Sequence, residues 1–429
     1  MSIIQTFVNA WRHDELRKRI LFVIGMFGVF VLGSHIPVPG TNPEALKPIF
    51  EGSGGTGGGI INILDMLGGG SLKRVSIFAL GIMPYINASI IFNLLVVVFP
   101  QLQELQKEGE AGRKKIGQWT KYLTVILAIV QAAGMMAIFS GQGGGGANIL
   151  LSPSPANYVF IVLTLAAGTC FLMWLGELIT EFGIGNGVSL IIFAGIIARL
   201  PQQFWLDVVR AIERNELVKV LLSAAILFIG MIAFVVFMHL AERRITIKYA
   251  RPGRYATPTH YLPLKVNMAG VIPIIFAISV LLFPATVAGF IPSEASRTWA
   301  NSFTGSWYYY VLYFVLTVIF TFFYTAVVFN PSEVADNLKK NGGYIPGIRP
   351  GKPTAEYLSR VLERLTFVGA LYLAFIATIP SILIQLIGGL SSLNIIAGTS
   401  VLIVVGVALD TVRELEARLT MMKYEKALR

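Results

Sequence analysis

The side chains best suited to catalysis or metal binding are few and scattered in this sequence. The four histidines, His13, His35, His239 and His260, lie far apart, and no paired-ligand spacing such as His-Glu-x-x-His occurs. Cys170, the only cysteine, lies inside an apolar run, so disulfides, a cysteine-ligated metal and thiol catalysis are not expected. The sequence therefore predicts no enzyme active site, no metal site and no cofactor.

Glycine-rich stretches do not supply a nucleotide site either. Residues 52–57 (GSGGTG) have the spacing of a dinucleotide-binding loop, but no strand precedes them and no βαβ unit surrounds them, so we interpret them as a flexible loop. No GxxxxGK[ST] phosphate-binding motif occurs in the chain. Any nucleotide hydrolysis linked to this protein must come from a partner.

Composition identifies the chain as a membrane protein. Of its 429 residues, 55% are hydrophobic and only 13% are charged, with a mean hydropathy of +0.70, so too little polar surface exists for a soluble domain. Long runs without charge mark helices that cross a bilayer. We predict ten spans, at residues 20–38, 75–99, 122–140, 157–176, 184–198, 218–240, 267–291, 307–329, 365–387 and 393–409.

Basic residues are distributed unevenly between the loops of this all-α, ten-span arrangement. Most of the 34 Lys and Arg residues fall on the side that holds both chain ends, so both termini are expected in the cytoplasm. Five spans in each half would invert the second half relative to the first. One echo supports this: GIMP (81–84) in the second span matches GVIP (270–273) in the seventh, although Gly and Pro are common in membrane helices.

The stretch from Ile60 to Pro100 changes character twice. A short amphipathic piece ends at three glycines, and a charge-free run follows from Val75. Within this run Gly81 and Pro84 would let a spanning helix weaken or kink at mid-depth. Such a pattern suggests a segment that opens, although the local sequence by itself favours a re-entrant or interfacial helix before an ordinary span.

The spans lack what other classes of membrane protein need. The acidic residues Glu177, Glu181, Glu242 and Asp410 lie at predicted helix ends, so neither the buried charge of a secondary transporter nor the mid-depth catalytic pair of an intramembrane enzyme is visible. Near the expected kinks the side chains are aliphatic. A ring of such side chains can close a pore by excluding water and still admit something wide, although they could simply face lipid or the core.

Two basic cytoplasmic loops are too large to be mere connectors. Residues 241–266 alternate as a β-hairpin does, with Arg-Pro-Gly-Arg at the turn, and the loop from Asn330 to Arg364 carries several Gly and Pro residues. Such loops can merely fix topology and contact anionic lipid, or they can dock a large partner such as ribosomal RNA. Their candidate docking residues are Arg243, Arg244, Lys248, Arg251, Arg254, Lys339, Lys340 and Arg349.

Several long blocks resemble one known family over almost the whole chain. They include SIFALGIMPYINASII (76–91), KEGEAGRKKIGQWTKY (107–122), FLMWLGELITEFGIGNGVSLIIFAGI (171–196), LPLKVNMAGVIPIIFA (262–277), FYTAVVFNPSEVADNLKKNGGYIPGIRPGKPTAEYL (323–358) and RLTFVGALY (364–372). These resemble the bacterial SecY family, the central subunit of the Sec protein-conducting channel. The regions 46–60, 141–157 and 292–306 match least.

The resemblance implies ten helices in two inverted halves around an hourglass pore with a plug. The implied plug is the piece 60–74, which seals the pore from the extracytoplasmic side, and the implied lateral gate involves Asn87 and Gln131. The plug residues are Ile61, Ile63, Leu64, Leu67, Gly68, Gly69 and Gly70. The implied pore ring is Ile82, Ile86, Val188, Ile192, Ile275 and Ile403, with Val188 in place of the commoner isoleucine.

The resemblance also implies partners and a location. The partners are the small membrane subunits SecE and SecG, the SecA ATPase, the ribosome through its RNA and proteins, nascent or precursor polypeptides, and membrane lipid. The location is the cytoplasmic membrane of a bacterium. We expect an amphipathic N-terminal helix at 1–19, halves at 20–200 and 218–412, an external hinge at 201–217 and a cytoplasmic tail at 413–429.

Overall fold

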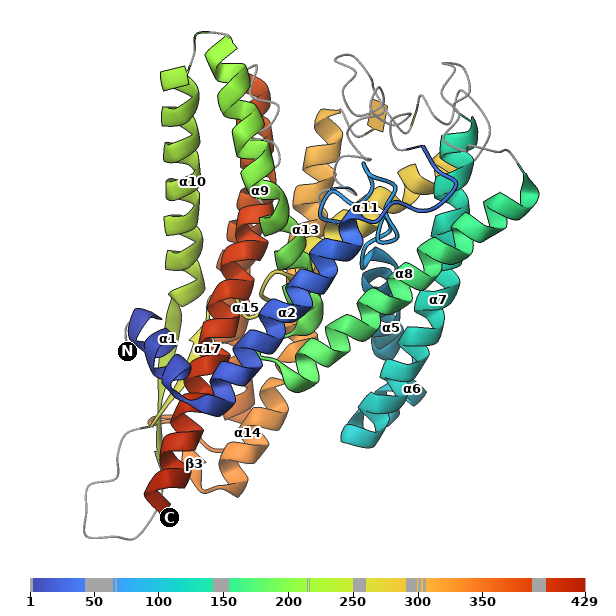
Figure 1. Cartoon of the computed structure of the whole chain (residues 1–429). Helices are drawn as coiled ribbons and strands as arrows, with labels where there is room; N and C mark the ends of the chain where they lie inside the picture. Colours follow the sequence, from blue (N-terminus) through green and yellow to red (C-terminus); the bar gives the residue numbers. More distant parts are fainter. Residues whose placement is uncertain are drawn as a thin grey trace. The chain divides into compact units, whose positions relative to one another are not determined.

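The computed structural model of the chain is mainly helical (Figure 1). The chain folds into two compact units: unit 1 holds Met1–Asn215, Leu282–Tyr309 and Val407–Arg429, and unit 2 holds Glu216–Leu281 and Tyr310–Gly406. The structure describes residues 3–42, 65, 68–141, 154–213, 215, 217–249, 260–290, 299, 302–303, 306–387 and 399–428.

The helices of unit 1 pack along the chain order. Helix α5 packs on α7, α7 on α8, and α8 on α9, while α2 lies against both α8 and α9. The complete helices of this unit are α1 (Ile3–Arg12), α2 (Asp14–His35), α5 (Met83–Val98), α6 (Pro100–Lys107), α7 (Glu110–Gly141), α8 (Pro155–Phe182) and α9 (Gly187–Glu213).

Unit 2 combines membrane helices with a small sheet. Helices α11 (Ile272–Phe290), α13 (Trp307–Val328) and α17 (Thr399–Leu428) have residues in both units. Strand β1 lies at the centre of the sheet and pairs antiparallel with both β2 and β3. The other elements are α10 (Leu217–Leu240), β1 (Glu242–Tyr249), β2 (His260–Lys265), α14 (Pro331–Lys340), β3 (Gly343–Tyr344) and α15 (Lys352–Ile387).

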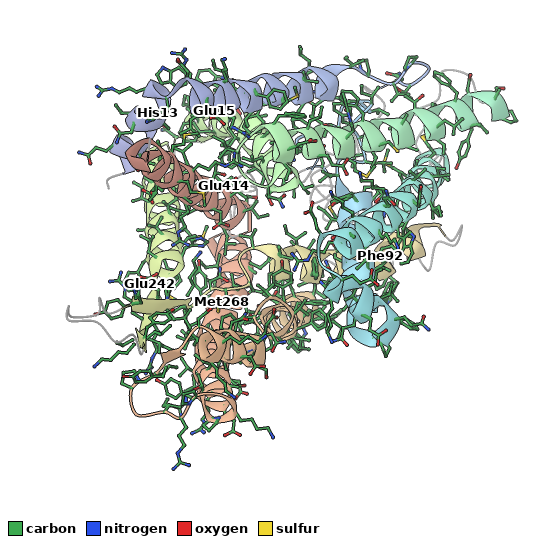
Figure 2. The ribbon with its side chains drawn as sticks, turned by 90° about the horizontal axis from the view of Figure 1, so that it is seen from below. His13, Glu15, Phe92, Glu242, Met268 and Glu414 are labelled. Carbon is green, nitrogen blue, oxygen red and sulfur yellow. The ribbon has the colours of Figure 1, made fainter. Side chains whose placement is uncertain are left out.

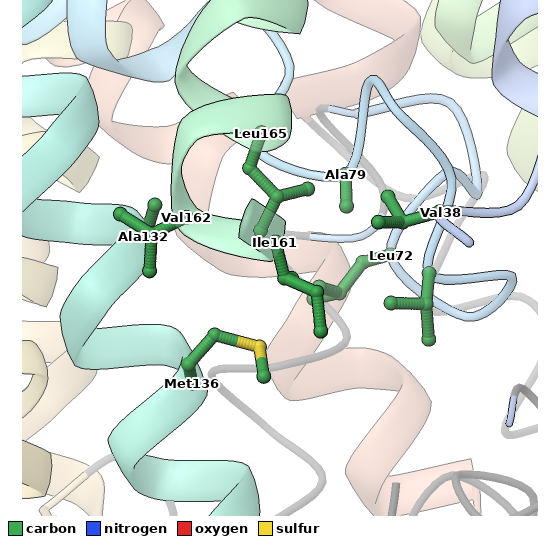
Figure 3. Close-up of a cluster of buried hydrophobic side chains, with 9 residues drawn as sticks. Val38, Leu72, Ala79, Ala132, Met136, Ile161, Val162 and Leu165 are labelled. Carbon is green, nitrogen blue, oxygen red and sulfur yellow. The ribbon is translucent and has the colours of Figure 1, made fainter. Parts of the chain in front are cut away.

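A buried apolar cluster joins α7 and α8 to the chain that precedes α5 (Figure 3). On α7 and α8 its members recur at helical spacing, so each helix presents one apolar face to the cluster. The nine buried members are Val38, Leu72, Val75, Ala79, Ala132, Met136, Ile161, Val162 and Leu165. This core fixes the segment that runs from Leu72 towards α5.

A second buried cluster brings the two ends of the chain together within unit 1. Ala10 of α1 and Leu16 of α2 pack with Leu415 and Leu419 of α17, and Thr6 donates a hydrogen bond of 2.9 Å to Glu416. Figure 2 shows the corresponding side-by-side placement of His13, Glu15 and Glu414. The N-terminal amphipathic helix ends at Arg12 and not at residue 19 as expected. The helix is interrupted at His13, and Asp14–His35 forms a separate helix.

Each of the ten expected spans overlaps one helix, namely α2, α5, α7, α8, α9, α10, α11, α13, α15 and α17. Among the described residues, the stretches Glu110–Met136, Pro155–Phe182, Trp307–Lys340 and Lys352–Ile379 are long and apolar enough to cross a membrane. Helices α5 and α6 would make a fifth, bent by 101°. Gly187–Gln202, Phe228–Leu240 and Ile272–Leu282 are shorter apolar helices.

The expectation of a kinked helix over residues 75–99 is wrong. Residues 75–82 form turns, and α5 begins only at Met83. Gly81 has a φ of +57°, a conformation that ends any preceding helix, and Pro84 occupies the first turn of α5, where its missing N–H costs nothing. The Gly-x-x-Pro pattern is therefore a helix start, not a kink.

Other boundaries also differ from expectation. Helix α9 continues through Pro201 to Glu213, so most of the segment 201–217 is helical. Helix α17 runs unbroken to Leu428, which makes the expected tail a continuation of the last span and places Asp410 within a helix instead of at its end. Glu177 likewise lies within α8, where it pairs with Lys121 at 2.6 Å.

Candidate functional site

The segment Gly68–Ile82, here called the turn segment, contains the last residues of the expected plug and leads to α5. The Gly70 N–H donates to the Asp65 carbonyl at 2.8 Å, and the Ser76 N–H donates to the Ser71 carbonyl at 3.0 Å. Gly69 and Gly70 have φ values of +71° and +81°. The three glycines therefore form turns, as expected from the sequence. Of the other plug residues, Ile61, Ile63, Leu64 and Leu67 lie outside the described residues.

Asp65 forms an ion pair inside unit 1. Its Oδ2 lies 2.8 Å from Nη2 of Arg199 on α9, and the two side chains are 0% and 5% exposed. Its Oδ1 accepts the backbone N–H groups of Leu72 at 3.1 Å and Lys73 at 3.0 Å. The carboxylate thus joins the turn segment to α9.

Sequence reasoning missed this ion pair. Asp65 is the only charged residue between positions 60 and 72, and Arg199 directly follows the fifth expected span. Opposite charges at these two places were a usable signal, because a buried charge is tolerated only when it is paired. What the sequence did not reveal is that the two residues meet.

The expected pore ring is divided between the two units. In unit 1, Ile82 precedes α5 directly and Ile86 lies one turn into it, and both are buried. Val188 and Ile192 lie one turn apart on α9, the first half-buried and the second buried. In unit 2 the ring residues are Ile275, half-buried on α11, and Ile403, buried on α17. All six side chains are apolar, so within each unit the ring positions offer no hydrogen-bonding side chain.

The two expected gate residues lie on a pair of packed helices. Asn87 is on α5 and Gln131 is on α7, and both are half-buried. Elsewhere on the same helices, Phe92 and Trp119 have ring centroids 6.5 Å apart (Phe92 is labelled in Figure 2). The structure therefore places both amides on helices that contact each other.

The two large basic loops form one folded platform in unit 2, here called the sheet platform (residues 242–249, 260–265 and 331–361). The predicted hairpin is confirmed: Glu242 pairs with Lys265 and Ile247 with His260. Figure 2 marks Glu242 at the start of β1 and Met268 just beyond β2. The added strand β3 comes from the second loop. Under the sheet lie the buried residues Ile245, Leu264, Ile345, Leu358 and Val361.

The platform presents its basic residues outward. Because strand side chains alternate, Arg244 and Lys248 lie on the face opposite buried Ile245 and Ile247. Arg244 also pairs with Glu242 at 2.8 Å. Of the predicted docking residues, the exposed ones are Arg243, Arg244, Lys248, Lys339, Lys340 and Arg349, while Arg251 and Arg254 lie outside the described residues.

Arg349 lies in a tight loop that is held from both sides. The Thr354 hydroxyl donates to the Arg349 carbonyl at 2.8 Å, and the Ile348 N–H donates to the Ile345 carbonyl at 3.0 Å. Ile345 in turn is buried under the sheet. This bonding anchors the backbone of the loop while the guanidinium remains exposed.

Within the described ranges, no group of three or more His, Cys, Asp or Glu side chains could hold a metal ion. Cys170 is half-buried on α8, a span of unit 1. The candidate functional features are therefore an apolar set of ring positions, an ion-paired turn segment and a basic platform.

Comparison with known proteins gives a consistent result over the whole length. Residues 76–412 match the SecY family. The protein translocase subunit SecY of Escherichia coli K12 is 47% identical over 424 residues, which cover 97% of this chain and 94% of the relative. The protein of the same name from Streptomyces coelicolor is 44% identical over 445 residues, with 100% of both chains covered.

Two solved structures share the fold. One is of a SecY protein whose plug domain stabilises the closed state of the translocation channel and maintains a membrane seal; its TM-score is 0.65 at 19% identity. The other, Sec61 in the canine ribosome-channel complex from the endoplasmic reticulum, has a TM-score of 0.65 at 17% identity. Both alignments cover 94% of this chain and 92% of the other chain.

Proposed function

This chain belongs to the SecY family, and we propose that it forms the central subunit of a protein-conducting channel through which unfolded polypeptide crosses a membrane. The observation that carries the proposal is the match to translocase subunits over 97% of the chain. The chain is not an enzyme. Because its sequence holds no phosphate-binding motif, the driving force comes from the SecA ATPase or from the translating ribosome.

The channel works by excluding water until a chain enters. Ile82, Ile86, Val188, Ile192, Ile275 and Ile403 form the constriction, and their apolar side chains close a pore that still yields to a polypeptide. Residues 60–74 plug it from the extracytoplasmic side. Supporting this, Ile82 is the last residue of the turn segment and Ile86 lies one turn into α5, so plug and constriction adjoin in the chain.

Sorting follows from partitioning. A segment of about 20 apolar residues gains free energy by leaving the aqueous pore sideways for lipid, whereas a polar segment continues across. The helices that carry Asn87 and Gln131 form one side of this lateral gate. Their close packing supports the assignment, because opening between α5 or α7 and a further helix would leave that pair intact.

The channel consists of two inverted halves, 20–200 and 218–412, joined by the external segment 201–217. It lies in the cytoplasmic membrane of a bacterium with both termini inside, and it assembles with the small membrane subunits SecE and SecG. The excess of basic residues on the side of both termini supports this orientation.

The sheet platform docks SecA and the ribosome. Its support is the outward row of basic side chains on a folded sheet, which suits the phosphates of ribosomal RNA and the acidic surface of a motor protein. The similar canine Sec61 was solved as part of a ribosome-channel complex. A secondary transporter or an intramembrane enzyme has no comparable observation in its favour.

Site-specific crosslinking during translocation tests the function. A photoreactive residue would be placed at Ile86 or Ile275, and a stalled secretory precursor supplied with SecA and ATP. We expect crosslinks to the precursor from both positions but not from Ile319, which is 54% exposed on α13. Precursor crosslinks from Ile319 alone would mean that the pore is assigned to the wrong residues.

Charge reversal at Arg349 tests the platform. Arg349→Glu replaces an exposed cation on an anchored loop, so we expect SecA-driven export to fall at least tenfold while the channel still assembles. The matched control is Lys115→Glu, which reverses an exposed lysine of unit 1 outside the platform. Equal export by the two variants would remove Arg349 from the docking surface.

A further inference from the structure

The buried ion pair between Asp65 and Arg199 belongs neither to the ring positions nor to the sheet platform. Asp65 lies in the proposed plug, and Arg199 lies on α9, the helix that also carries Val188 and Ile192. The Asp65 carboxylate uses both oxygens: one accepts two backbone N–H groups and the other meets the guanidinium. This arrangement connects the proposed plug directly to a helix that carries proposed ring residues.

Three contacts between the proposed plug (residues 60–74) and α9 lie along one face of this helix. Gly195, Arg199 and Gln202 are spaced four and three residues apart, so they lie on the same face of the helix. A Cβ added to Gly69 would lie 2.9 Å from the Gly195 Cα, which shows that the two backbones touch. At the other end of the stripe, Arg74 donates a hydrogen bond of 3.4 Å to Gln202.

Arg199 also covers the glycine turn. A Cβ added to Gly70 would lie 3.7 Å from the Arg199 Cδ, so the aliphatic stem of the arginine packs along this turn while its head reaches Asp65. The arginine therefore contributes both charge and shape to the contact. A shorter or uncharged side chain would lose at least one of them.

The other end of the turn segment is held differently. Leu72, Val75 and Ala79 are buried in the apolar cluster with α7 and α8 (Figure 3). Such packing is non-directional and persists through small rearrangements. Asp65 instead depends on one ion pair and two hydrogen bonds, and Gly69 and Gly70 lie between the two anchors. Among the described residues, the part that can detach is therefore Asp65 with Gly68–Ser71.

A buried ion pair has two stable outcomes. While intact, each charge is compensated; once the partner is lost, the remaining buried charge is costly, and leaving for water restores its hydration. We propose that the Asp65–Arg199 ion pair is a latch that holds the proposed plug on α9 and sets how readily the channel opens. This inference rests on the proposed function, in which residues 60–74 close the pore.

Ion conductance of the purified channel complex in planar bilayers, in potassium chloride and without precursor, tests the latch. Arg199→Met and Asp65→Asn each leave one buried charge without its ion-pair partner, which shifts a closed–released equilibrium by about 100-fold. We expect each single variant to raise the resting conductance at least tenfold. The double variant removes both charges, so its conductance should fall below that of either single variant.

Lys115→Gln on α7 is the control, because it removes an exposed cation of unit 1 that lies outside the turn segment and α9 and leaves the ion pair intact. Its conductance should equal that of the unchanged protein. Single variants with unchanged conductance, or a double variant that leaks more than either single variant, would overturn the latch. If the single variants do not assemble, Arg199→Lys replaces them, since it keeps the charge and loses the planar fork; unchanged conductance in that variant has the same meaning.

Hydrogen exchange adds a readout that does not depend on conduction. The N–H groups of Leu72 and Lys73 donate to Asp65, so releasing the latch should speed their exchange at least tenfold in the single variants. Crosslinking of precursor in the unchanged protein separates the two proposals. If the precursor crosslinks to Ile86 and Ile275 but the latch variants behave like the unchanged protein, the latch alone is refuted. If the precursor crosslinks to neither position, the proposed channel is refuted.

Discussion

The two Gly-x-x-Pro segments, 81–84 and 270–273, show how the same residues build the same local structure in different surroundings. Gly81 and Gly270 have φ values of +57° and +65°. In each case a helix, α5 or α11, begins two residues later, with the proline as its second residue. The start of each helix is therefore defined locally, because it requires only the positive φ of the glycine and the missing N–H of the proline.

The packing around the two segments also corresponds. A Cβ on Gly168 of α8 would lie 1.9 Å from the carbonyl oxygen of Ile77, and a Cβ on Gly369 of α15 would lie 2.4 Å from that of Val266. Both carbonyls lie four residues before their Gly-x-x-Pro glycine. Gly168 and Gly369 each occupy the expected fourth span of their half, an observation in favour of the proposed inverted halves.

The difference lies in what holds the glycine carbonyl. The Gly81 carbonyl accepts a hydrogen bond of 3.4 Å from Thr169 on α8, whereas the Gly270 carbonyl accepts one of 3.1 Å from Asn267, three residues earlier. Upstream, the first segment continues into buried turns and the Asp65 ion pair, while the second follows β2 of the sheet platform. One local device therefore leads to the proposed plug and the other to the proposed docking surface.

The largest effect is expected where the backbones touch. Gly168→Ala and Gly369→Ala each place a Cβ against a carbonyl that belongs to another segment, which should lower the free energy of unfolding by about 3 kcal/mol. Gly168→Ala should be the worse of the two, since its contact is shorter. Thermal unfolding in detergent measures both. The control is Gly230→Ala on α10, where nothing lies within 4 Å and a gain of about 0.5–1 kcal/mol is expected. Equal unfolding temperatures for all three variants would show that the backbone contacts at Gly168 and Gly369 do not stabilise the fold.

Backbone conformation gives the next effect. Gly81→Ala and Gly270→Ala force an L-residue into the left-handed region, at a cost of about 1–2 kcal/mol. Asn tolerates this region better, so Gly270→Asn should recover part of the loss in the same unfolding measurement. No difference between the Ala and Asn variants would show that φ at this glycine is unimportant.

The smallest effect separates the two carbonyl contacts. Asn267→Leu should lower the free energy of unfolding by about 1 kcal/mol and Thr169→Val by about 0.5 kcal/mol. The second loss is smaller because the hydrogen bond from Thr169 to the Gly81 carbonyl is the longer of the two. Thr164→Val on the same helix is the control, since this exposed hydroxyl bonds within its own turn at 2.8 Å. A larger loss of stability for Thr169→Val than for Asn267→Leu would show that the contact from another helix matters more than the local one, contrary to this prediction.

Much of the fold followed from the sequence because it depends on nearby residues. Every expected span overlaps a helix, and the hairpin pairs as its alternation predicted. The errors are equally instructive. Gly81 and Pro84 were interpreted as a kink, because hydropathy alone does not distinguish a helix from turns in an apolar run. Similarly, the charged residues that begin at Asp410 mark the end of the apolar run and not the end of the helix, so the continuation of α17 to Leu428 was not predicted.

The candidate site divides in the same way. Residue types identified the aliphatic ring positions and the basic loops, since aliphatic side chains exclude water and exposed cations attract phosphates whatever their neighbours. The strand β3, only two residues long, was not predicted because its pairing with Lys248 and Tyr249 comes from another loop. Local propensity is too weak to define so short a strand.

The sequence by itself determined the order of apolar runs, the helix starts at Gly-x-x-Pro, the hairpin and the basic character of two loops, because each depends on residues within a few positions of one another. Only the tertiary structure decided that Asp65 meets Arg199, that Gly168 and Gly369 receive backbone carbonyls, and that two loops share one sheet. The physical reason is that a buried charge or a close backbone contact is defined by its distant partner, and packing selects that partner.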